Sequence, residues 1–423
     1  MASGLASSRV ILDESWAFKD ATRQDTSYLT HGYHRYPAKF IPQLARRVIS
    51  ENTRPGDLVC DPFMGSGTTL VEALLAGRNA HGSDINPVAV LIAKAKTTPI
   101  EPSRLRSVAE PLLRSIEGNL PRADLPPLSE YSRERIGYWF AEKQRGDLAA
   151  ILAAIKEISD SDVQTLLLCS FSNILKSCSR WLMKSVKPTV DKDKHPADAR
   201  RAFVLNTRRL LKKNEEFYSA SAHFRSARCT TEACDARRLS LSSGSAMLVV
   251  TSPPYVTSYE YADLHQLSAL WLGYAGSLRD FRGRFIGSVQ KRQGEPQQVY
   301  SSLARETVAK LQQRDARGAA GAQRYFFEMQ QAFEEMHRML ARKGRAAVVI
   351  GNTDLRRVEI KNAEIFAQTM QEIGFAVHKI IKRPVPGKIL PLTRDEKTGK
   401  FTRSAAADRL AYPVEFIVIM EKR

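Results

Sequence analysis

The stretch "DLVCDPFMGSGTTLVEALLAGRNAHGSDINP", residues 57–87, decides the fold class. It reads as a buried strand, a loop that contains glycines, a short helix that ends at Gly77, and a second strand that ends at Asp84. This order is typical of one half of a doubly wound α/β sheet, in which ligands bind at the carboxyl ends of the strands. We therefore expect a ligand pocket at that edge of the sheet.

The glycine loop and the acids at the strand ends narrow the choice of ligand. Gly65 and Gly67 let the backbone approach a ligand closely. Leu70 stands where a dinucleotide fingerprint has its third glycine, and the P-loop lysine is absent, so a pyrophosphate is disfavoured. Asp84 lies where an acid accepts hydrogen bonds from both ribose hydroxyls, and Asp61 would lie near a positive charge. The ligand should therefore have a ribose, no pyrophosphate and a positive charge, and S-adenosylmethionine has all three features. The alternative is a structural turn with a solvated aspartate.

Helical patterns replace strand patterns between residues 101 and 222, which read as a large helical insertion. The α/β pattern resumes with the strand "AMLVVT", residues 246–251. A polar, Gln-rich excursion from the core follows, and then a long amphipathic helix that Gly344 should stop. The chain closes with two alternating strands, residues 375–385 and 412–422, which we expect to pair antiparallel at the sheet edge.

Composition points to a nucleic acid as partner. The chain has 64 lysines and arginines against 45 acidic residues, a net charge of +19 and a pI near 9.8. Such a charge, spread along the chain, favours a polyanion, although a basic protein without this role remains the alternative. Five cysteines form no disulfide framework, and Cys229 and Cys234 lack the further ligands of a metal site. No stretch approaches transmembrane length, so we expect a soluble intracellular protein with no membrane partner.

The pentapeptide "TSPPY", residues 251–255, ends an apolar strand with two prolines. The exocyclic amine of a nucleobase is a poor nucleophile, because its lone pair is delocalised into the ring. Acceptors for both amino hydrogens favour a tetrahedral nitrogen that can attack, and the carbonyls of Pro253 and Pro254 and the hydroxyl of Ser252 are such acceptors. Tyr255 adds a ring on which an extruded base can stack. The alternative is an ordinary Pro-Pro loop beside a core tyrosine.

The motifs "DPFMGSGTT" (61–69), "GSDINP" (82–87) and "TSPPY" together resemble those of amino-methylating, site-specific DNA methyltransferases. The Ser-Pro-Pro-Tyr form is typical of the cytosine-N4 branch of that family. The segment "HGYHRYPAKF" (31–40) is similar to the one that the family places over the methionine end of the cofactor. The resemblance implies an enzyme that moves a methyl group from S-adenosylmethionine to cytosine N4 in a specific sequence of double-stranded DNA. It also implies direct displacement on a flipped base, with no metal.

Residue roles follow from the same resemblance, position by position. It implies catalysis by Ser252, Pro253, Pro254 and Tyr255. It implies cofactor contacts by Tyr36, Lys39, Phe40, Asp61, Phe63, Gly65, Gly67, Thr68, Asp84, Ile85 and Asp235. Such an enzyme would work in the prokaryotic cytoplasm, associated with the nucleoid, either alone or with a cognate restriction endonuclease.

Other functions stay open at this point. Adenine-N6 relatives usually carry an acid where Ser252 stands, but methylation of adenine N6 or of an RNA base remains an alternative. A DNA-binding subunit that has lost catalysis is a further one. Cytosine-C5 chemistry is disfavoured, because it commonly uses a Pro-Cys turn and none of the five cysteines follows a proline.

Two basic stretches are the candidates for DNA contacts. Around residues 179–203, Arg180, Lys184 and Lys187 would contact phosphates and Trp181 would stack or wedge, unless it belongs to the core. In residues 275–322, Arg282 and Arg284 would read bases. We thus expect five segments: the cofactor-binding half of the core (1–100), the DNA-binding helical insertion (101–222), the catalytic-motif segment (223–274), the basic target-recognition excursion (275–322) and the remaining core (323–423).

Overall fold

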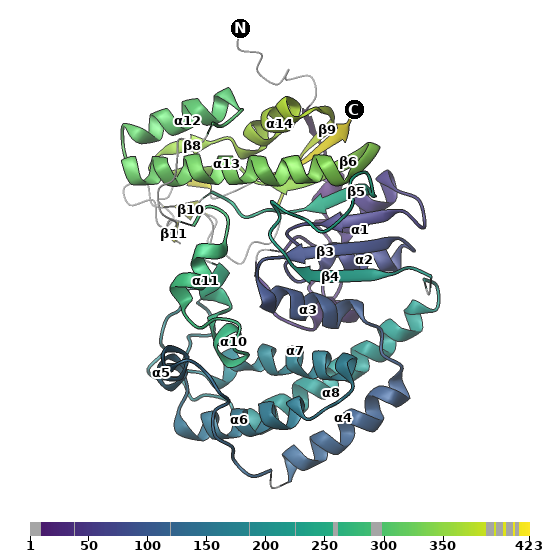
Figure 1. The fold of residues 1–423 in the computed structure, drawn as a ribbon, viewed down its shortest axis with the longest axis vertical. Helices are drawn as coiled ribbons and strands as arrows, with labels where there is room; N and C mark the ends of the chain where they lie inside the picture. The colour runs from purple at the N-terminus through teal and green to yellow at the C-terminus, as the bar shows by residue number, and fades with distance from the viewer. Residues whose placement is uncertain are drawn as a thin grey trace.

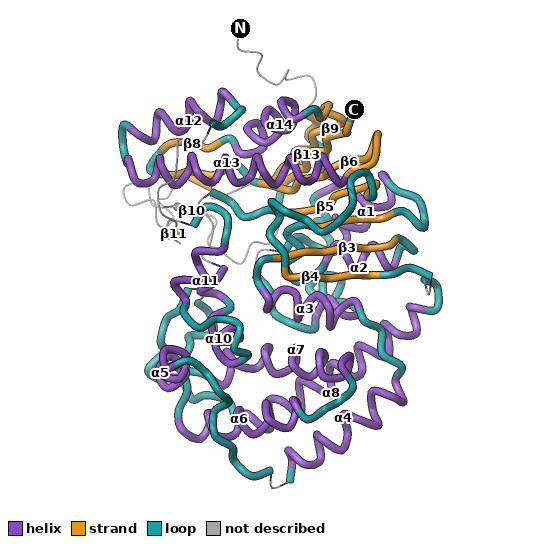
Figure 2. The backbone as a smooth tube through the Cα atoms, viewed as in Figure 1, coloured by secondary structure: helices purple, strands orange, loops and turns teal. Residues whose placement is uncertain are grey.

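The computed structural model describes residues 10–37, 39–118, 120–185, 187–224, 226–256, 261–288, 298–385, 393–394, 401–402, 409–410 and 414–423. A mixed sheet forms the upper half of the molecule as drawn, and helices fill the lower half (Figure 1). The tube view separates the two halves clearly, with the long strands of the sheet gathered above α3 (Pro87–Thr97) (Figure 2).

The sheet of the described residues has eight strands in the order β1-β9-β13-β6-β5-β2-β3-β4. Their bounds are β1 (Val10–Leu12), β9 (Phe375–Pro384), β13 (Val414–Lys422), β6 (Leu340–Ile350), β5 (Ala246–Thr251), β2 (Leu58–Asp61), β3 (Asn79–Asp84) and β4 (Cys229–Ala233). From β6 to β4 every pair is parallel, whereas β13 runs antiparallel to both β6 and β9. The carboxyl ends of β2, β3, β4 and β5 therefore meet at one edge of the sheet.

Helices cover both faces of this sheet. The apolar side chains of β6 alternate between the two faces, because successive residues of a strand point to opposite sides. One face packs against α1 (Pro42–Asn52), α2 (Thr68–Leu75) and part of α3. The other packs against α13 (Ala316–Met339) and α14 (Asn362–Ile373), with α12 (Ser302–Gln312) lying on α13. This is a doubly wound α/β fold with a C-terminal antiparallel strand pair, as expected.

A separate helical layer lies below α3 in Figure 1. It consists of α4 (Pro102–Glu117), α5 (Glu130–Trp139), α6 (Glu142–Lys156), α7 (Ser161–Cys178) and α8 (Ala199–Ser221). Its apolar core continues into α3 and into α10 (Gln266–Trp271). The helical insertion expected over residues 101–222 is thus present, and it packs against α3 and the turn at Leu29–Gly32.

Smaller elements complete the described chain. Two 3-10 turns, Glu14–Trp16 and Leu29–Gly32, precede α1. The short helices α9 (Tyr261–Leu264) and α11 (Leu278–Arg284) flank α10. A hairpin joins β7 (Thr353–Leu355) to β8 (Val358–Ile360), and a small sheet contains β10 (Thr393–Arg394), β11 (Phe401–Thr402) and β12 (Arg409–Leu410).

Three expectations about the core are wrong in detail. The second half of the 275–322 excursion does not leave the core: Val299, Ala304 and Leu311 are buried against α13 and α14. Gly344 does not stop the long helix, because α13 ends at Met339 and Gly344 lies within β6. The β9–β13 pair is not at the extreme edge either, since the three-residue strand β1 extends the sheet beyond β9.

Candidate active site

The loop between β2 and α2 requires glycines because of its backbone conformation and because it leaves little room for side chains. Gly65 and Gly67 have φ angles of +48° and +73°, in the left-handed region that favours glycine. A Cβ on Gly65 would lie 3.1 Å from Cε1 of Tyr36, and one on Gly67 would lie 3.0 Å from Cβ of Ala93. The loop is therefore pressed between the Tyr36 ring and α3.

Asp61 anchors this loop rather than facing solvent. Its side chain is 2% exposed and accepts hydrogen bonds from the Thr251 hydroxyl (2.6 Å) and from the Phe63 amide (3.1 Å). The Thr69 hydroxyl lies 2.8 Å from the second carboxylate oxygen. Burial raises the pKa of Asp61 to about 7. One carboxylate thus joins the ends of β2 and β5 and the start of α2.

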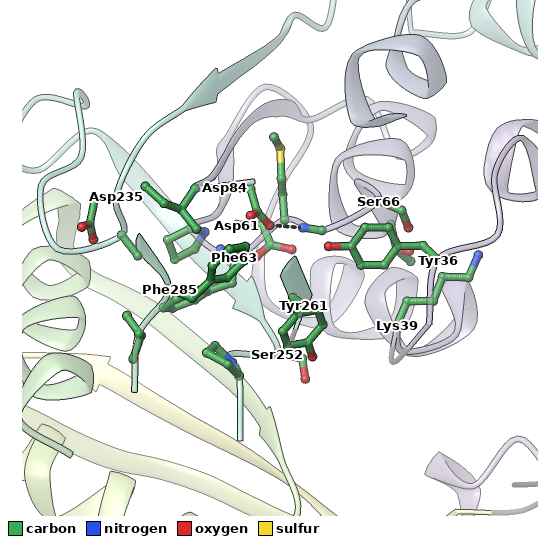
Figure 3. A pocket seen from close by; sticks show the side chains of 18 of the residues that line it. Tyr36, Lys39, Asp61, Phe63, Ser66, Asp84, Asp235, Ser252, Tyr261 and Phe285 are labelled. Carbon is green, nitrogen blue, oxygen red and sulfur yellow. Dashed lines mark hydrogen bonds between the residues drawn. The ribbon is translucent and has the colours of Figure 1, made fainter. Parts of the chain in front are cut away.

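Asp84 ends β3 and lies in the middle of the pocket (Figure 3). Its two oxygens accept hydrogen bonds from the amides of Gly65 and Asn86, both at 2.9 Å. Burial raises the pKa of Asp84 to about 6. Since each carboxylate oxygen has two lone pairs, Asp84 can also accept hydrogen bonds from a ligand.

The segment over residues 31–40 is fastened to α2 beneath the pocket. His31 Nε2 lies 2.7 Å from the fully buried carboxylate of Glu72, which also accepts from Arg46 Nε at 2.9 Å. Burial lowers the pKa of His31 to about 4. The Lys39 ammonium donates to the His31 carbonyl at 3.1 Å, and burial lowers its pKa to about 8. These contacts place Tyr36 against the glycine loop, where its ring stacks on His265 with the centroids 4.6 Å apart.

These elements line a pocket whose empty space, including the part open to solvent, is about 830 Å³ (Figure 3). Twelve of the residues expected at the site line it: Tyr36, Lys39, Phe40, Asp61, Phe63, Gly65, Thr68, Asp84, Ile85, Asp235, Ser252 and Pro254. The structure therefore brings the candidate cofactor residues and part of the candidate catalytic turn into one cavity.

Two buried hydroxyls indicate that a polar ligand belongs in this pocket. Ser66 and Thr68 line it, are 2% and 4% exposed, and have no hydrogen-bond partner among the described residues. Buried hydroxyls without partners are costly, so a ligand that bonds to them would recover that energy. Together with Asp84, this set fits the polar groups of S-adenosylmethionine.

The candidate catalytic turn is split between the pocket and the core behind it. Ser252 and Pro254 line the pocket, whereas Pro253 and Tyr255 do not. A Cβ on Gly351 would lie 3.4 Å from Cε2 of Tyr255, which places the Tyr255 ring beside β6. The Pro254 carbonyl accepts a hydrogen bond from the Tyr325 hydroxyl at 2.6 Å, so one of its lone pairs is occupied.

Asp235 follows β4, a strand that the sequence analysis did not anticipate. Asp235 lines the pocket, and Arg237 holds its carboxylate, with Nη2 at 2.6 Å from Oδ2 and Nε at 2.9 Å from Oδ1. The arginine side chain thus fixes the carboxylate of Asp235 at the pocket wall.

Sequence reasoning missed several pocket residues. Ser66 lies inside the quoted glycine motif, so its hydroxyl could have been included. Tyr261, Phe285 and Ile286 come from segments without a recognisable motif, and only the folded chain places them here. Arg284, expected to read DNA bases, is exposed at the rim of this same pocket.

The expectation that Trp181 contacts DNA is wrong. Its side chain is 2% exposed and stacks on Trp139, with the ring centroids 5.2 Å apart. Arg180, Lys184 and Lys187 are exposed around it. Arg282 is ion-paired with Asp263, its Nε lying 3.0 Å from the carboxylate.

Comparisons with known proteins agree with this geometry. A family model described as DNA methylase (N6_N4_Mtase) matches residues 5–95. The type II methyltransferase M.MvaI of Kocuria varians is 27% identical over 409 residues, 89% of this chain and 88% of the relative. The chain is related to the DNA methyltransferases. A second type II methyltransferase, M.MjaII of Methanocaldococcus jannaschii, is 39% identical to this chain over 97 residues, 23% of this chain and 18% of that one.

The resemblance to DNA methyltransferases seen in the sequence is thereby confirmed. Among solved structures, protein TTHA0409 of Thermus thermophilus, crystallised with S-adenosyl-L-methionine, is 16% identical over 44% of this chain and 53% of that one, with a TM-score of 0.22. The comparisons do not distinguish cytosine N4 from adenine N6. In the described part of the chain, every helix is too short or too polar to cross a membrane.

Proposed function

We propose that this DNA methyltransferase moves a methyl group from S-adenosylmethionine to the exocyclic N4 of cytosine in a specific DNA sequence. The observation that supports the proposal is the position of Ser252, which lines the same pocket as Asp84 and the buried hydroxyls of Ser66 and Thr68. An acceptor for an amino group and the residues suited to a nucleoside cofactor therefore share one cavity.

In the proposed mechanism the protein positions two partners and accepts hydrogen bonds. The cofactor supplies an electrophilic methyl group. The Ser252 hydroxyl and the Pro253 carbonyl accept from the two amino hydrogens of the target base, which turns the nitrogen lone pair toward the methyl group. The second proline holds the turn, because its carbonyl is already bonded to Tyr325. No covalent bond between the protein and the base is required, so no cysteine takes part.

A neutral hydroxyl at residue 252 supports cytosine over adenine as the target. Adenine-N6 relatives usually carry an acid at this position. The proposed stacking partner of the flipped base is Tyr255, at the far side of the turn, with Tyr261 on the pocket side. Base flipping is part of the proposal, since an amino group inside a duplex cannot reach the pocket.

We also propose that the loop over residues 179–190 contacts the DNA backbone. The buried Trp181 forms an antiparallel bridge with Val190 that closes this loop. Lys176 and Lys194 hold it further, by donating to the carbonyls of Ser185 and Trp181 at 2.8 Å each. The exposed Arg180, Lys184 and Lys187 then project from a rigid base, as phosphate contacts require.

The test is to express the chain in cells that lack methylation and to analyse their DNA. We expect N4-methylcytosine by mass spectrometry of the digested DNA, confined to one sequence context by modification-sensitive sequencing. The Ser252→Ala variant, expressed in parallel, is the control. N6-methyladenine alone would overturn the choice of base, and unmodified DNA from a chain that binds S-adenosylmethionine would favour a subunit without catalysis.

A further inference from the structure

Helix α13 sends two buried side chains toward the active site from behind. Tyr325 and Glu328 are three residues apart, so they lie on one face of the helix, and they are 1% and 4% exposed. Neither lines the pocket. Each instead contacts segments that do.

Tyr325 holds the catalytic turn and the segment after α11 together. Its hydroxyl donates to the Pro254 carbonyl at 2.6 Å. Its ring lies so close to Gly287, whose φ is +73°, that a Cβ there would be 3.1 Å from Cδ2 of the tyrosine. The ring is itself stacked on Phe366 of α14. Tyr325 thus transmits the position of the α13–α14 layer to the turn that carries Ser252.

Glu328 links the two walls of the cofactor pocket. Its Oε1 lies 3.0 Å from Nη1 of Arg237, the arginine that holds Asp235. Its Oε2 accepts from the Gly287 amide at 2.7 Å, directly after the pocket residues Phe285 and Ile286. One buried carboxylate therefore fixes Asp235 on one side and residues 285–286 on the other.

We propose that Tyr325 and Glu328 are positioning residues with separate tasks. Tyr325 sets the catalytic turn, and Glu328 sets the pocket wall formed by Asp235, Phe285 and Ile286. The assignment rests on the proposed function, because it presumes that the turn performs methyl transfer and that the pocket holds S-adenosylmethionine. Separate tasks predict a separation of effects: loss of the Tyr325 hydroxyl acts on turnover, and loss of the Glu328 charge acts on cofactor affinity.

The variants Tyr325→Phe and Glu328→Gln test this separation, because each keeps the size of the side chain. For Tyr325→Phe we expect kcat to fall about 10-fold or more, since small displacements of a catalytic group are costly. Its Kd for S-adenosylmethionine should stay within about twofold, because the tyrosine hydroxyl donates to the turn and not to the pocket wall formed by Asp235, Phe285 and Ile286. For Glu328→Gln we expect the Kd to rise about 5- to 10-fold, the scale of a lost charge-assisted hydrogen bond, with kcat at saturating cofactor nearly unchanged.

Two matched substitutions serve as controls. Tyr300→Phe removes a hydroxyl from an exposed tyrosine, and Glu335→Gln removes a charge from the same helix at its Arg338 pair. Both should leave kcat and Kd unchanged, and thermal unfolding of all four variants reports any general loss of stability.

Calorimetry with S-adenosylmethionine and single-turnover methylation of DNA are measured on the full chain. Equal losses of kcat and affinity in both variants, in step with lower melting temperatures, would overturn the separate tasks, as would wild-type behaviour of both. Absence of DNA methylation by the wild-type chain would instead count against the proposed function, and the cofactor titration of Glu328→Gln would still test the task of Glu328.

Discussion

The glycine-loop edge of the sheet and the helical layer beneath it carry different kinds of information. At the edge, Asp61 and Asp84 end strands and Ser252 follows one, and the parallel strands bring them together. In the helical layer part of the positive charge is neutralised within the protein. Arg104, Arg106, Lys143, Arg200 and Arg208 all form ion pairs with acids of the same layer.

The contrast shows what net charge can and cannot predict. A sum over the chain counts every lysine and arginine equally, whereas a phosphate competes only for those that are exposed and not already paired. The loop over 179–190 carries cations of the second kind, since its Arg180, Lys184 and Lys187 are exposed and appear in no ion pair of the described residues. Four predictions test this contrast, from the largest expected effect to the smallest.

Trp181→Ala should destabilise the fold and not merely weaken DNA binding. Removing a buried tryptophan that stacks on Trp139 should cost about 3–5 kcal/mol of unfolding free energy. Urea denaturation followed by fluorescence measures it, with Tyr138→Ala, an exposed neighbour of Trp139, as control. A variant as stable as the parent but weaker in DNA binding would instead support a contact between Trp181 and DNA.

Ser252→Ala should act on chemistry alone. Loss of one preorganised hydrogen-bonding group at a reacting centre costs roughly 100-fold in turnover, or about 2.7 kcal/mol or more of activation free energy. Binding of S-adenosylmethionine should stay near that of the parent in calorimetry. Ser245→Ala, at an exposed position just before the same strand, is the control. Near-native turnover of Ser252→Ala would remove the hydroxyl from the mechanism.

Asp84→Ala should weaken S-adenosylmethionine binding by about 1.5–3 kcal/mol, the range for hydrogen bonds to a charged group. Because burial raises the pKa of Asp84 to about 6, the parent should lose affinity as the pH falls through that value and the carboxylate becomes protonated. The variant should lack this step, although Asp61, with a pKa of about 7, can still contribute one. Calorimetry across pH 5–8 measures both, with Asp124→Ala as an exposed control; identical pH profiles would argue against the role of Asp84.

The double change Lys184→Ala and Lys187→Ala should weaken binding to DNA of any sequence. Its effect should be the smallest of the four predictions. The slope of log K against log salt should decrease by about 2, close to one unit for each phosphate that the protein no longer neutralises. Arg106→Ala with Arg208→Ala removes the same charge from paired positions and should leave the slope unchanged. If both pairs altered the slope equally, the distinction between paired and exposed cations would fail.

Much of the sheet edge was predictable because local sequence carries it. A strand, a glycine turn and an acid lie within a few residues of one another, so β2, β3, β5 and their terminal residues follow from pattern alone. The strand β4 lacks that signal: "CTTEA" has no apolar run, and only its pairing with β3 makes it a strand. Trp181 was misleading for a related reason, since its stacking partner Trp139 is distant in sequence. Tyr325 reads as one more apolar position of an amphipathic helix until its hydroxyl is placed against Pro254.

The bond between Asp61 and the Thr251 hydroxyl has a consequence for protein engineering. Thr251 directly precedes Ser252, so the carboxylate that anchors the glycine loop also fixes the position of the proposed catalytic turn. A hybrid enzyme that takes its turn from another parent must therefore import the threonine with it, or provide a new donor for a buried acid. The smallest exchangeable module is thus a matched pair of strand ends, β2 and β5, and a crossover between them would separate parts that work only together.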